Sequence, residues 1–196
     1  MAERSASAGS HPPAPGEDVS CALALVNTRF MSAGRPVDLI ADASGATEWL
    51  TGRGLLPRGA VVSGQNAARL GALRETTRAL FAARADTAAP APGDLSALNA
   101  ALAGAPLVPA LTWGDAGPRR DEQLTGPAAD LVDVALARLA GDALRVLTGA
   151  GEVQPAPCGA HGCIRWFLRT HAARQWCSAR CGDRVRAARH YARHHQ

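Results

Sequence analysis

Four cysteines near the C-terminus constrain this chain more than any other feature of its sequence. Cys158 and Cys163 form a C-x4-C pair, and Cys177 and Cys181 form a C-x3-C pair that begins after thirteen intervening residues. Two such pairs supply the four thiolates that a tetrahedral structural zinc ion requires, and the residues between them are enough for a tight hairpin. The spacing therefore predicts a zinc module at this end of the chain.

Disulfides and an iron–sulfur cluster are the alternatives to zinc. Two disulfides need an oxidising compartment, and the first 18 residues lack the apolar centre of a secretory signal. An iron–sulfur cluster usually needs more apolar shielding and often uses other spacings. His161 or His171 could replace a cysteine, although four thiolates are the simpler set. Closed coordination leaves no position for a water, so we expect a structural zinc that performs no chemistry.

Positive charge is concentrated around the same cysteines. Every one of the 21 basic residues is arginine, and the whole chain carries a net charge of +4. Residues 158–196 hold eight arginines against one acid, which gives +7, whereas residues 1–157 hold thirteen arginines against sixteen acids, which gives −3. Such asymmetry favours a polyanion partner for the C-terminal end, although solvated arginines on an indifferent surface would give the same count.

The composition divides the chain into three parts. Residues 1–19 are rich in Ala, Ser, Pro and Gly, which indicates a disordered tail in a cytoplasmic protein. Residues 148–157 are rich in Gly and Pro and indicate a linker between a body at 20–147 and the cysteine module at 158–196. No stretch of the sequence approaches the roughly 18 apolar residues of a membrane span.

The hydrophobic pattern of residues 20–147 predicts a mainly α-helical body. Asp94 suits the N-cap of one helix, and Pro127 suits the first turn of another. A possible small β-hairpin pairs Leu107–Trp113 with Glu122–Thr125. The segments expected as helices are Ala46–Gly52, Gln65–Arg84, Asp94–Ala103 and Pro127–Leu147.

The cysteine module is expected to contain a hairpin followed by a helix. Ile164–Arg169 has the character of a strand, and Arg174–Trp176 can return antiparallel to it. Ser178 then suits a helix N-cap, with Cys181 in the first helical turn. A knuckle, a hairpin and a helix that supplies a ligand in its first turn form a treble-clef-like zinc finger.

The expected last helix carries arginines on one face. Arg186, Arg189 and Arg193 recur at i, i+3 and i+7, and Arg184 lies near the helix start. Arginine offers a bidentate fork to phosphates and to guanine, so these four residues are candidate contacts for nucleic acid, with phosphates favoured over bases. The alternative is a solvated helix that only keeps the tail soluble.

The sequence contains no catalytic constellation. It has no G-x-S-x-G, no phosphate-cradling glycine loop and no H-E-x-x-H, so we do not expect an enzyme. Cys21 stands alone at the start of the body, where a buried spectator is the simpler interpretation.

A second class of function is a small-molecule-binding or protein-interaction module with a purely structural zinc finger. In that case Asn27, Arg29 and Trp49 would line a pocket, although Asn27 could equally cap a turn and Trp49 fill the core.

Residues 176–184, which read Trp-Cys-Ser-x-x-Cys-Gly-Asp-Arg, resemble the CGNR zinc finger when taken with the preceding cysteine pair. This finger ends bacterial proteins that are described as stress-induced transcription regulators and that begin with a so-called ABATE domain. Residues 23–28, which read Leu-Ala-Leu-Val-Asn-Thr, resemble the opening motif of that domain, and Glu48-Trp49-Leu50 resembles its tryptophan helix.

The resemblance implies that the four cysteines hold zinc and that the finger contacts DNA. The helical body is then expected to sense a signal or to form a dimer. A homodimer is expected because one finger alone would bind DNA weakly. Asp183 stands where the family has Asn, and Arg169-Thr170-His171 stands where Asp-Thr-Ser is expected. An ionised Asp183 cannot donate an amide hydrogen bond and would repel phosphates, although early in a helix it can accept backbone N–H groups. The DNA target, the direction of regulation and any effector stay open.

Overall fold

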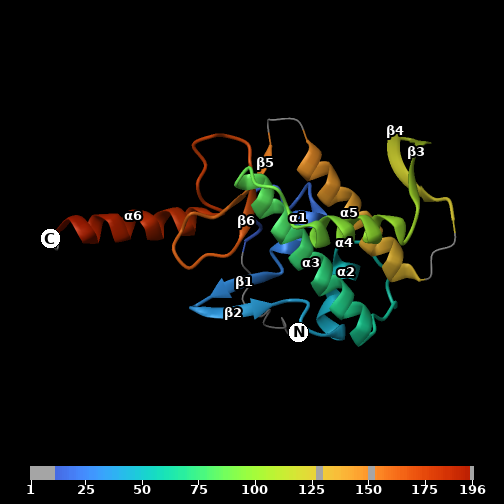
Figure 1. The fold of residues 1–196 in the computed structure, drawn as a ribbon, viewed down its shortest axis with the longest axis horizontal. Helices are drawn as coiled ribbons and strands as arrows, with labels where there is room; N and C mark the ends of the chain where they lie inside the picture. Colours follow the sequence, from blue (N-terminus) through green and yellow to red (C-terminus); the bar gives the residue numbers. More distant parts are fainter. Residues whose placement is uncertain (1–11, 127–129, 150–152, 195–196) are drawn as a thin grey trace.

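The computed structural model describes residues 12–126, 130–149 and 153–194. Figure 1 shows a largely helical body from which one helix projects at the C-terminal end. The helices are α1 (Cys21–Val26), α2 (Ala43–Gly52), α3 (Gly64–Ala85), α4 (Pro92–Ala103), α5 (Leu131–Thr148) and α6 (Ala179–His194). The strands are β1 (Arg29–Ser32), β2 (Arg35–Asp38), β3 (Leu107–Gly114), β4 (Gly117–Leu124), β5 (Gln154–Pro157) and β6 (Trp166–Arg169), and they pair as three antiparallel hairpins.

Helices α2, α3 and α4 confirm three of the expected helices, and local caps explain where they begin. Asp42 caps α2 by accepting the N–H of Gly45, so this helix starts three residues earlier than predicted. The prediction of Asp94 as an N-cap was wrong. Helix α4 begins at Pro92, whose fixed φ suits the first helical position, and Asp94 lies in the first turn.

Helix α5 begins at Leu131, behind a capping box formed by Asp130 and Asp133. Pro127, which was expected to open this helix, lies outside the described residues. Leu131 itself is 54% exposed. The buried face of α5 includes Val132, Ala135, Leu136, Leu139, Ala140, Ala143 and Val146.

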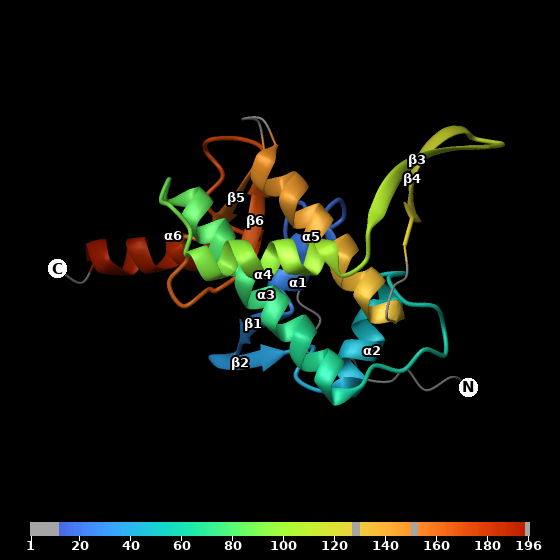
Figure 2. The ribbon, with the colours of Figure 1, turned by 45° about the vertical axis from the view of Figure 1, so that its right-hand side comes forward.

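Two hairpins belong to the body. The pair β3–β4 confirms the expected hairpin and extends it, and Figure 2 shows it as an arm that leaves the helical body. The pair β1–β2 was not predicted. Its two-residue turn, Ala33 and Gly34, has φ angles of 48° and 77°, which match the right-handed twist of short hairpins.

The core of the body forms where α1 meets α3 and α5. Helix α1 is apolar almost throughout, and its residues from Ala22 to Val26 are buried. Because the chain has few aromatic residues, aliphatic side chains such as Leu25, Leu70 and Leu139 fill most of this core, together with Phe81. A helix that is apolar on all sides must be covered on all sides, which explains the central place of α1.

Strand β6 lies between two hydrophobic clusters. Successive side chains of a strand point to opposite faces. Trp166 and Leu168 accordingly pack into the body core, whereas Phe167 packs with the cysteines. The ring centroids of Trp166 and Phe81 are 6.0 Å apart. One short strand therefore joins the body to the cysteine module.

The partner of β6 corrects the hairpin expected inside the cysteine module. Strand β6 pairs with β5, with Leu168 opposite Pro155, and residues 174–176 form no strand. Residues 154–157 belong to the predicted linker, which rests in part on Pro155 and Pro157. Proline has no N–H to donate, and an edge strand tolerates it because its outer side has no partner strand. The carbonyl groups of the strand still accept hydrogen bonds.

Residues 12–19, which were predicted to be disordered, pack against both parts of the molecule, and we call them the N-terminal strap. Ala14 is buried among the cysteines. The carbonyl oxygen of Pro15 accepts the N–H of Leu168 at 2.8 Å, so the strap continues the hydrogen bonding of β6 on its open side. Residues 1–11 of the expected tail lie outside the described residues.

Glu17 of the strap forms a buried polar junction. Its carboxylate accepts hydrogen bonds from Asn27 Nδ2 at 2.6 Å and from Arg165 at 2.7 Å. Both side chains of the Glu17–Arg165 ion pair are less than one-tenth exposed. Arg53 also donates to the carbonyl oxygen of Glu17. Buried charges of this kind are tolerated only as a pair, so the strap is part of the folded unit.

The Glu17→Gln variant tests this role of the strap. We expect its free energy of unfolding to fall by about 2–4 kcal/mol in urea titrations, because Arg165 then stays buried without a carboxylate. The matched control is Glu122→Gln, which removes the carboxylate 3.8 Å from Arg138 where both side chains are more than one-third exposed. The control should lose less than about 1 kcal/mol. Equal losses in the two variants would contradict a structural role for Glu17.

Candidate functional site

The four cysteines converge on one point from separate positions along the chain. Cys158 follows β5, Cys163 lies in the turn before β6, Cys177 precedes α6 and Cys181 lies in the first turn of α6. Their Sγ atoms all lie within 4.8 Å of one another. The Sγ atom of Cys177 is 3.8 Å from that of Cys163 and 3.8 Å from that of Cys181. Tetrahedral zinc with Zn–S bonds of about 2.3 Å separates its sulfurs by about 3.8 Å, so the arrangement fits zinc.

Backbone geometry positions the first pair of cysteines. The N–H of Cys163 donates to the carbonyl oxygen of Ala160 at 2.9 Å, which closes a tight turn. Gly162 within this turn has a φ of 71°, a conformation that glycine adopts without steric strain. The N–H of Gly159 donates to the carbonyl oxygen of Gln175, and this bond brings the second pair back toward the first.

The start of α6 positions the second pair. Ser178 Oγ accepts the N–H of Cys181 at 3.2 Å, which confirms the predicted N-cap and the predicted place of Cys181 in the first turn. A thiolate at this helix end is favoured by the helix dipole. Gly182 lies against the ring of Trp176, where an added Cβ would come within 3.1 Å of a ring carbon. A larger residue at position 182 would therefore displace Trp176.

The thiols perturb one another strongly. Hydrogen bonds from Cys163 and then Cys177 lower the pKa of Cys158 far below its ordinary value. The hydrogen bond to Cys158 raises the pKa of Cys163 to about 11, and the bonds to Cys158 and Cys163 raise the pKa of Cys177. Four thiolates at this distance repel one another, so full ionisation needs a bound dication. The donor set and its spacing are those of a closed zinc site with four cysteine ligands.

Helix α6 leaves the rest of the molecule after its first turn, as Figure 1 shows. Cys181 and Gly182 are its buried residues, and every residue from Arg186 to His194 is exposed. Arg186, Arg189 and Arg193 share one face of this exposed part by their spacing. The structure thus exposes the candidate arginines together, while their contact with nucleic acid stays a prediction.

The four candidate arginines differ in what they contact. Arg184 donates to the carbonyl oxygen of His161 at 3.1 Å and lies 3.9 Å from Cys181 Sγ, so it faces the cysteine cluster. The guanidinium of Arg186 lies 5.9 Å from the centre of the Trp176 ring. It also forms an ion pair with Asp183 whose side chains are both well exposed.

Arg189 and Arg193 lie further out along α6. Arg193 Nε donates to the carbonyl oxygen of Arg189 at 3.3 Å. The guanidinium of Arg189 has no hydrogen-bond or ion-pair partner within the described ranges. These two residues have the fewest structural contacts of the four and the most freedom to bind another molecule.

Asn27 connects the body with β6. Its Oδ1 accepts the N–H of Trp166 at 2.8 Å, and its Nδ2 donates to the carbonyl oxygen of Trp166 at 2.8 Å and to Glu17. The side chain is 5% exposed. Asn27 therefore pairs with the backbone of β6 in the manner of a neighbouring strand, and this geometry favours a structural role over a ligand contact.

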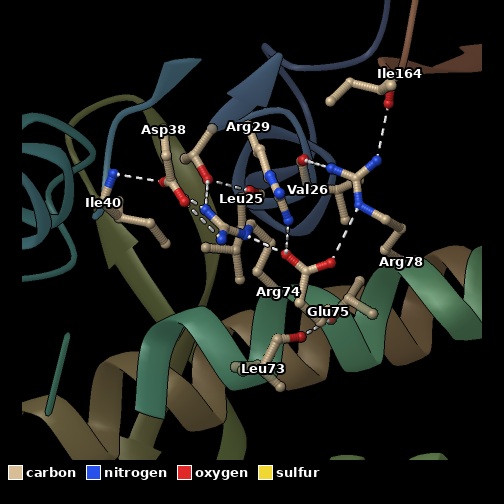
Figure 3. A network of polar contacts seen from close by, with 12 residues as sticks. Leu25, Val26, Arg29, Asp38, Ile40, Leu73, Arg74, Glu75, Arg78 and Ile164 are labelled. Carbon is tan, nitrogen blue, oxygen red and sulfur yellow. Dashed lines mark hydrogen bonds and ion pairs between the residues drawn. The ribbon is translucent and has the colours of Figure 1, made fainter. Parts of the chain in front are cut away.

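Arg29 lies at the edge of a polar network that Figure 3 shows. Its guanidinium is 3.9 Å from the carboxylate of Glu75. The centre of the network is Arg74, which is 6% exposed and donates to both carboxylate oxygens of Asp38, at 2.6 and 2.9 Å. Arg74 Nε donates to Glu75 at 2.9 Å. The network ties α3 to the β1–β2 hairpin.

Arg78 extends this network to the cysteine module (Figure 3). It donates to the carbonyl oxygen of Val26 at the end of α1 and, at 2.8 Å, to that of Ile164 just before β6. Sequence reasoning missed Arg78, Glu17 and Arg165 as connecting residues. Their partners lie far away along the chain, and no local motif signals such contacts.

Trp49 and Cys21 have local surroundings. Trp49 packs partly buried against the body core, and the guanidinium of Arg53 lies 5.8 Å from the centre of its ring. Cys21 is half-buried, and burial followed by the negative charge of Asp142 raises the pKa of its thiol. A protonated thiol is consistent with the spectator role predicted for Cys21. No contact between described residues brings Asn27, Arg29 and Trp49 into one site, and their use by a ligand stays a prediction.

Two family models match the chain. Residues 20–150 match the ABATE model, which is described as "Putative stress-induced transcription regulator", and residues 156–194 match the CGNR zinc finger. The four cysteines therefore form the structural zinc site of a CGNR finger. No curated protein matches this chain in sequence. Within the described ranges, none of the helices is both long and apolar enough to cross a bilayer.

The Cys177→Ala variant tests the metal site. We expect zinc content to fall well below the roughly one ion per chain of the parent protein, because three thiolates bind zinc far more weakly than four. Hydrogen exchange should accelerate over residues 156–182, while α3 and α5 stay protected. Cys21→Ala is the matched control and should retain its zinc. A Cys177→Ala protein with full zinc content and a protected finger would contradict the assignment.

The Asp38→Asn variant gives a pH-dependent test of the network. Burial opposes ionisation of Asp38, but hydrogen bonds from Arg74 and from the Ile40 N–H outweigh burial and lower its pKa. A carboxyl whose pKa is lower in the folded chain stabilises the fold above its unfolded pKa of about 3.9, and this stabilisation is lost as the pH falls through the folded pKa. We expect Asp38→Asn to lower the free energy of unfolding by about 1–3 kcal/mol at pH 7.

The difference between Asp38→Asn and the parent protein should shrink as the pH falls below about 4, measured by urea unfolding across pH. Asp115→Asn, in the exposed turn of the β3–β4 hairpin, serves as the control and should change stability little at any pH. A loss that stays constant down to about pH 2 would show that the charge of Asp38 is not what stabilises Arg74.

Proposed function

The chain belongs to the ABATE family and carries a C-terminal CGNR zinc finger, and on this basis we propose that it is a transcription regulator that binds DNA through the finger. One observation carries the proposal: an arginine-bearing helix starts at the zinc site and extends freely beyond the rest of the molecule. The pairing of cysteines at a turn and at a helix start also supports a treble-clef-like finger. DNA binding would place the protein in the cytoplasm.

The geometry of α6 would allow this helix to enter the major groove of DNA. Coordination of Cys181 fixes the first turn of α6, so the direction of the whole helix is set by the metal site. An α-helix with its side chains is about 10–12 Å across, and the major groove of B-DNA is about 12 Å wide. Since residues 186–194 are exposed on every side, the body covers none of the outer helix.

The distribution of charge also supports DNA as the partner. Within the finger, Arg165 is buried with Glu17, so its charge is already neutralised. Asp183 offsets part of the charge of Arg186. The arginines that remain exposed are Arg169, Arg174, Arg180, Arg184, Arg186, Arg189 and Arg193. Arg189 and Arg193 are the strongest candidates for phosphate contacts, because fewer protein groups compete for them.

The unpacked outer part of α6 also supports DNA as the partner. Short helices without packing are marginal in water, because nucleation is costly and each residue adds little. Like-charged arginines three and four residues apart destabilise such a helix further. Phosphates along this face would remove the repulsion, so DNA binding and helix stability reinforce each other.

The body has a dimerising or sensory role in this proposal. The β3–β4 arm exposes Leu111 and Trp113, which are 74% and 76% accessible. Large apolar side chains on a projecting arm favour contact with another protein surface, and a second copy of this chain would place two fingers on one DNA. Light scattering of the zinc-loaded protein gives its molar mass and shows directly whether the chain forms a dimer.

The double variant Arg186→Ala/Arg189→Ala tests DNA contact by the finger. Each arginine that neutralises a phosphate adds about 0.9 to the dependence of log K on log salt concentration. We expect the double variant to bind duplex DNA more weakly and to lower this slope by about 1–2. Arg58→Ala/Arg120→Ala removes the same charge from exposed sites on the body and is the control. A slope that is unchanged in the first variant would remove α6 from the interface.

Selection from a random duplex library by the zinc-loaded full chain then distinguishes specific from non-specific binding. An enriched motif would support sequence-specific regulation, and a palindromic motif would support a dimer. A library that stays random would reduce the finger to a structural or non-specific role.

A further inference from the structure

A cleft between α3, α4 and α5 has no part in the function proposed above. Figure 2 shows the three helices together, and α4 packs on both α3 and α5. The cleft has a volume of about 330 Å³. Leu73 and Thr76 of α3 and Leu136 of α5 form its buried floor, and Ala100 and Ala101 of α4 form one wall. Its size lies at the lower end of small-molecule sites, and a cavity of about 150 Å³ already admits benzene.

The small side chains of α4 account for the space. Helix α4 turns Ala97, Ala100, Ala101 and the following Gly104 toward the cleft. Methyl groups allow close helix packing, but they cannot fill the space left where three helices meet at different angles. The anchor of α4 in the core is Leu98, which is 4% exposed.

Thr76 supplies a hydroxyl without a protein partner on the floor of the cleft. The residue is 9% exposed, and its Oγ1 has no hydrogen bond to any residue in the described ranges. The neighbouring Thr77, by contrast, donates to the carbonyl oxygen of Leu73 at 2.8 Å. The hydroxyl is accessible from the cleft and is not one of the fully buried polar atoms without a partner, so a ligand oxygen can hydrogen-bond to it in place of solvent.

Charges at one end of the cleft are already balanced. Asp133 Oδ1 accepts a hydrogen bond from Arg69, and Oδ2 accepts the N–H of Asp130 at 3.2 Å. The carboxylate is 7% exposed, and its partner Arg69 also donates to Asn66. Because this ion pair is neutral as a whole and its acceptors are in use, the cleft favours a ligand without net charge.

We propose that this cleft binds a small, uncharged, largely apolar molecule that carries one hydroxyl or carbonyl oxygen, and that this oxygen hydrogen-bonds to Thr76. A single aromatic ring with one hydroxyl fits the volume, the apolar walls and the isolated polar group. Phenol is the simplest probe of this class, and toluene is the matched probe that lacks the oxygen.

The cleft and the finger share α3. Thr76 lies in the cleft, whereas Arg78 and Phe81 of the same helix contact the residues around β6. A ligand that holds α4 against α3 therefore acts on the helix that holds the finger. The role of the ligand as an effector rests on the proposed regulatory function, whereas binding in the cleft does not.

Titration of the ¹⁵N-labelled, zinc-loaded full chain with phenol, followed by amide chemical shifts, tests the proposal. We expect saturable shifts at residues 73, 76, 100 and 104 with a Kd of about 0.1–1 mM. Ala100→Leu should abolish these shifts by filling the cleft. Ala103→Leu, an exposed position on the same helix outside the cleft, should leave them unchanged. Melting temperatures of both variants confirm that they fold.

Thr76→Val separates the hydrogen bond from the fit of the ring. This change should weaken phenol binding about 5-fold and leave toluene binding unchanged, since it removes the hydroxyl but keeps the shape. Equal effects on the two probes would overturn the role of Thr76. Shifts that do not saturate below about 10 mM, or that cluster outside the cleft, would overturn the site.

Phenol binding needs no DNA, so a failure of DNA binding would not affect the titration. Repeating the salt titration of DNA binding at saturating phenol tests the effector role alone. A change of more than about 3-fold in DNA affinity, absent in Ala100→Leu, would support that role. An unchanged affinity would overturn it and leave the cleft as a binding site only.

Discussion

Successive side chains of β6 point in opposite directions, and this alternation connects the two parts of the molecule. Trp166 and Leu168 enter the core of the body, while Phe167 enters the small cluster around the cysteines. The backbone of the same strand is held by β5, by Asn27 and by the N-terminal strap. One short strand therefore contributes side chains to both clusters, which couples the finger to the body despite their separate sequence families.

Different forces hold the two sides of this strand. On the body side, burial of aliphatic side chains supplies the stability, and the polar groups there are paired, as in the Arg74–Asp38 contact. On the finger side the buried cluster is small, and much of the free energy of folding must come from metal coordination. The Glu17–Arg165 pair lies where the two sides meet. This pair fixes the position of the finger relative to the body, because an arrangement that separated the two residues would leave a buried charge without its partner.

Local patterns in the sequence predicted the metal site and most helices, but not the contacts between distant segments. Cysteine spacing and helical periodicity are properties of short windows, so the ligands of zinc and the helices of the body were found. Strand β5 has the composition of a linker, because two of its four residues are proline, and an edge strand has little other signal. The N-terminal strap has the composition of a disordered tail and is ordered by tertiary contacts alone. Asn27 lies in a recognisable motif, yet its pairing with the backbone of Trp166 spans too much of the chain to be predicted from sequence.

The N-terminal strap also limits how far the parts of this protein can be separated. It precedes the ABATE match at residues 20–150, and its contacts reach into the CGNR match at residues 156–194. A finger transplanted alone would lose the carboxylate that neutralises Arg165 and would expose Trp166 and Leu168 to water. The finger is therefore not a portable module in this chain, and fusions or truncations designed at the family boundaries would cut through its structural support.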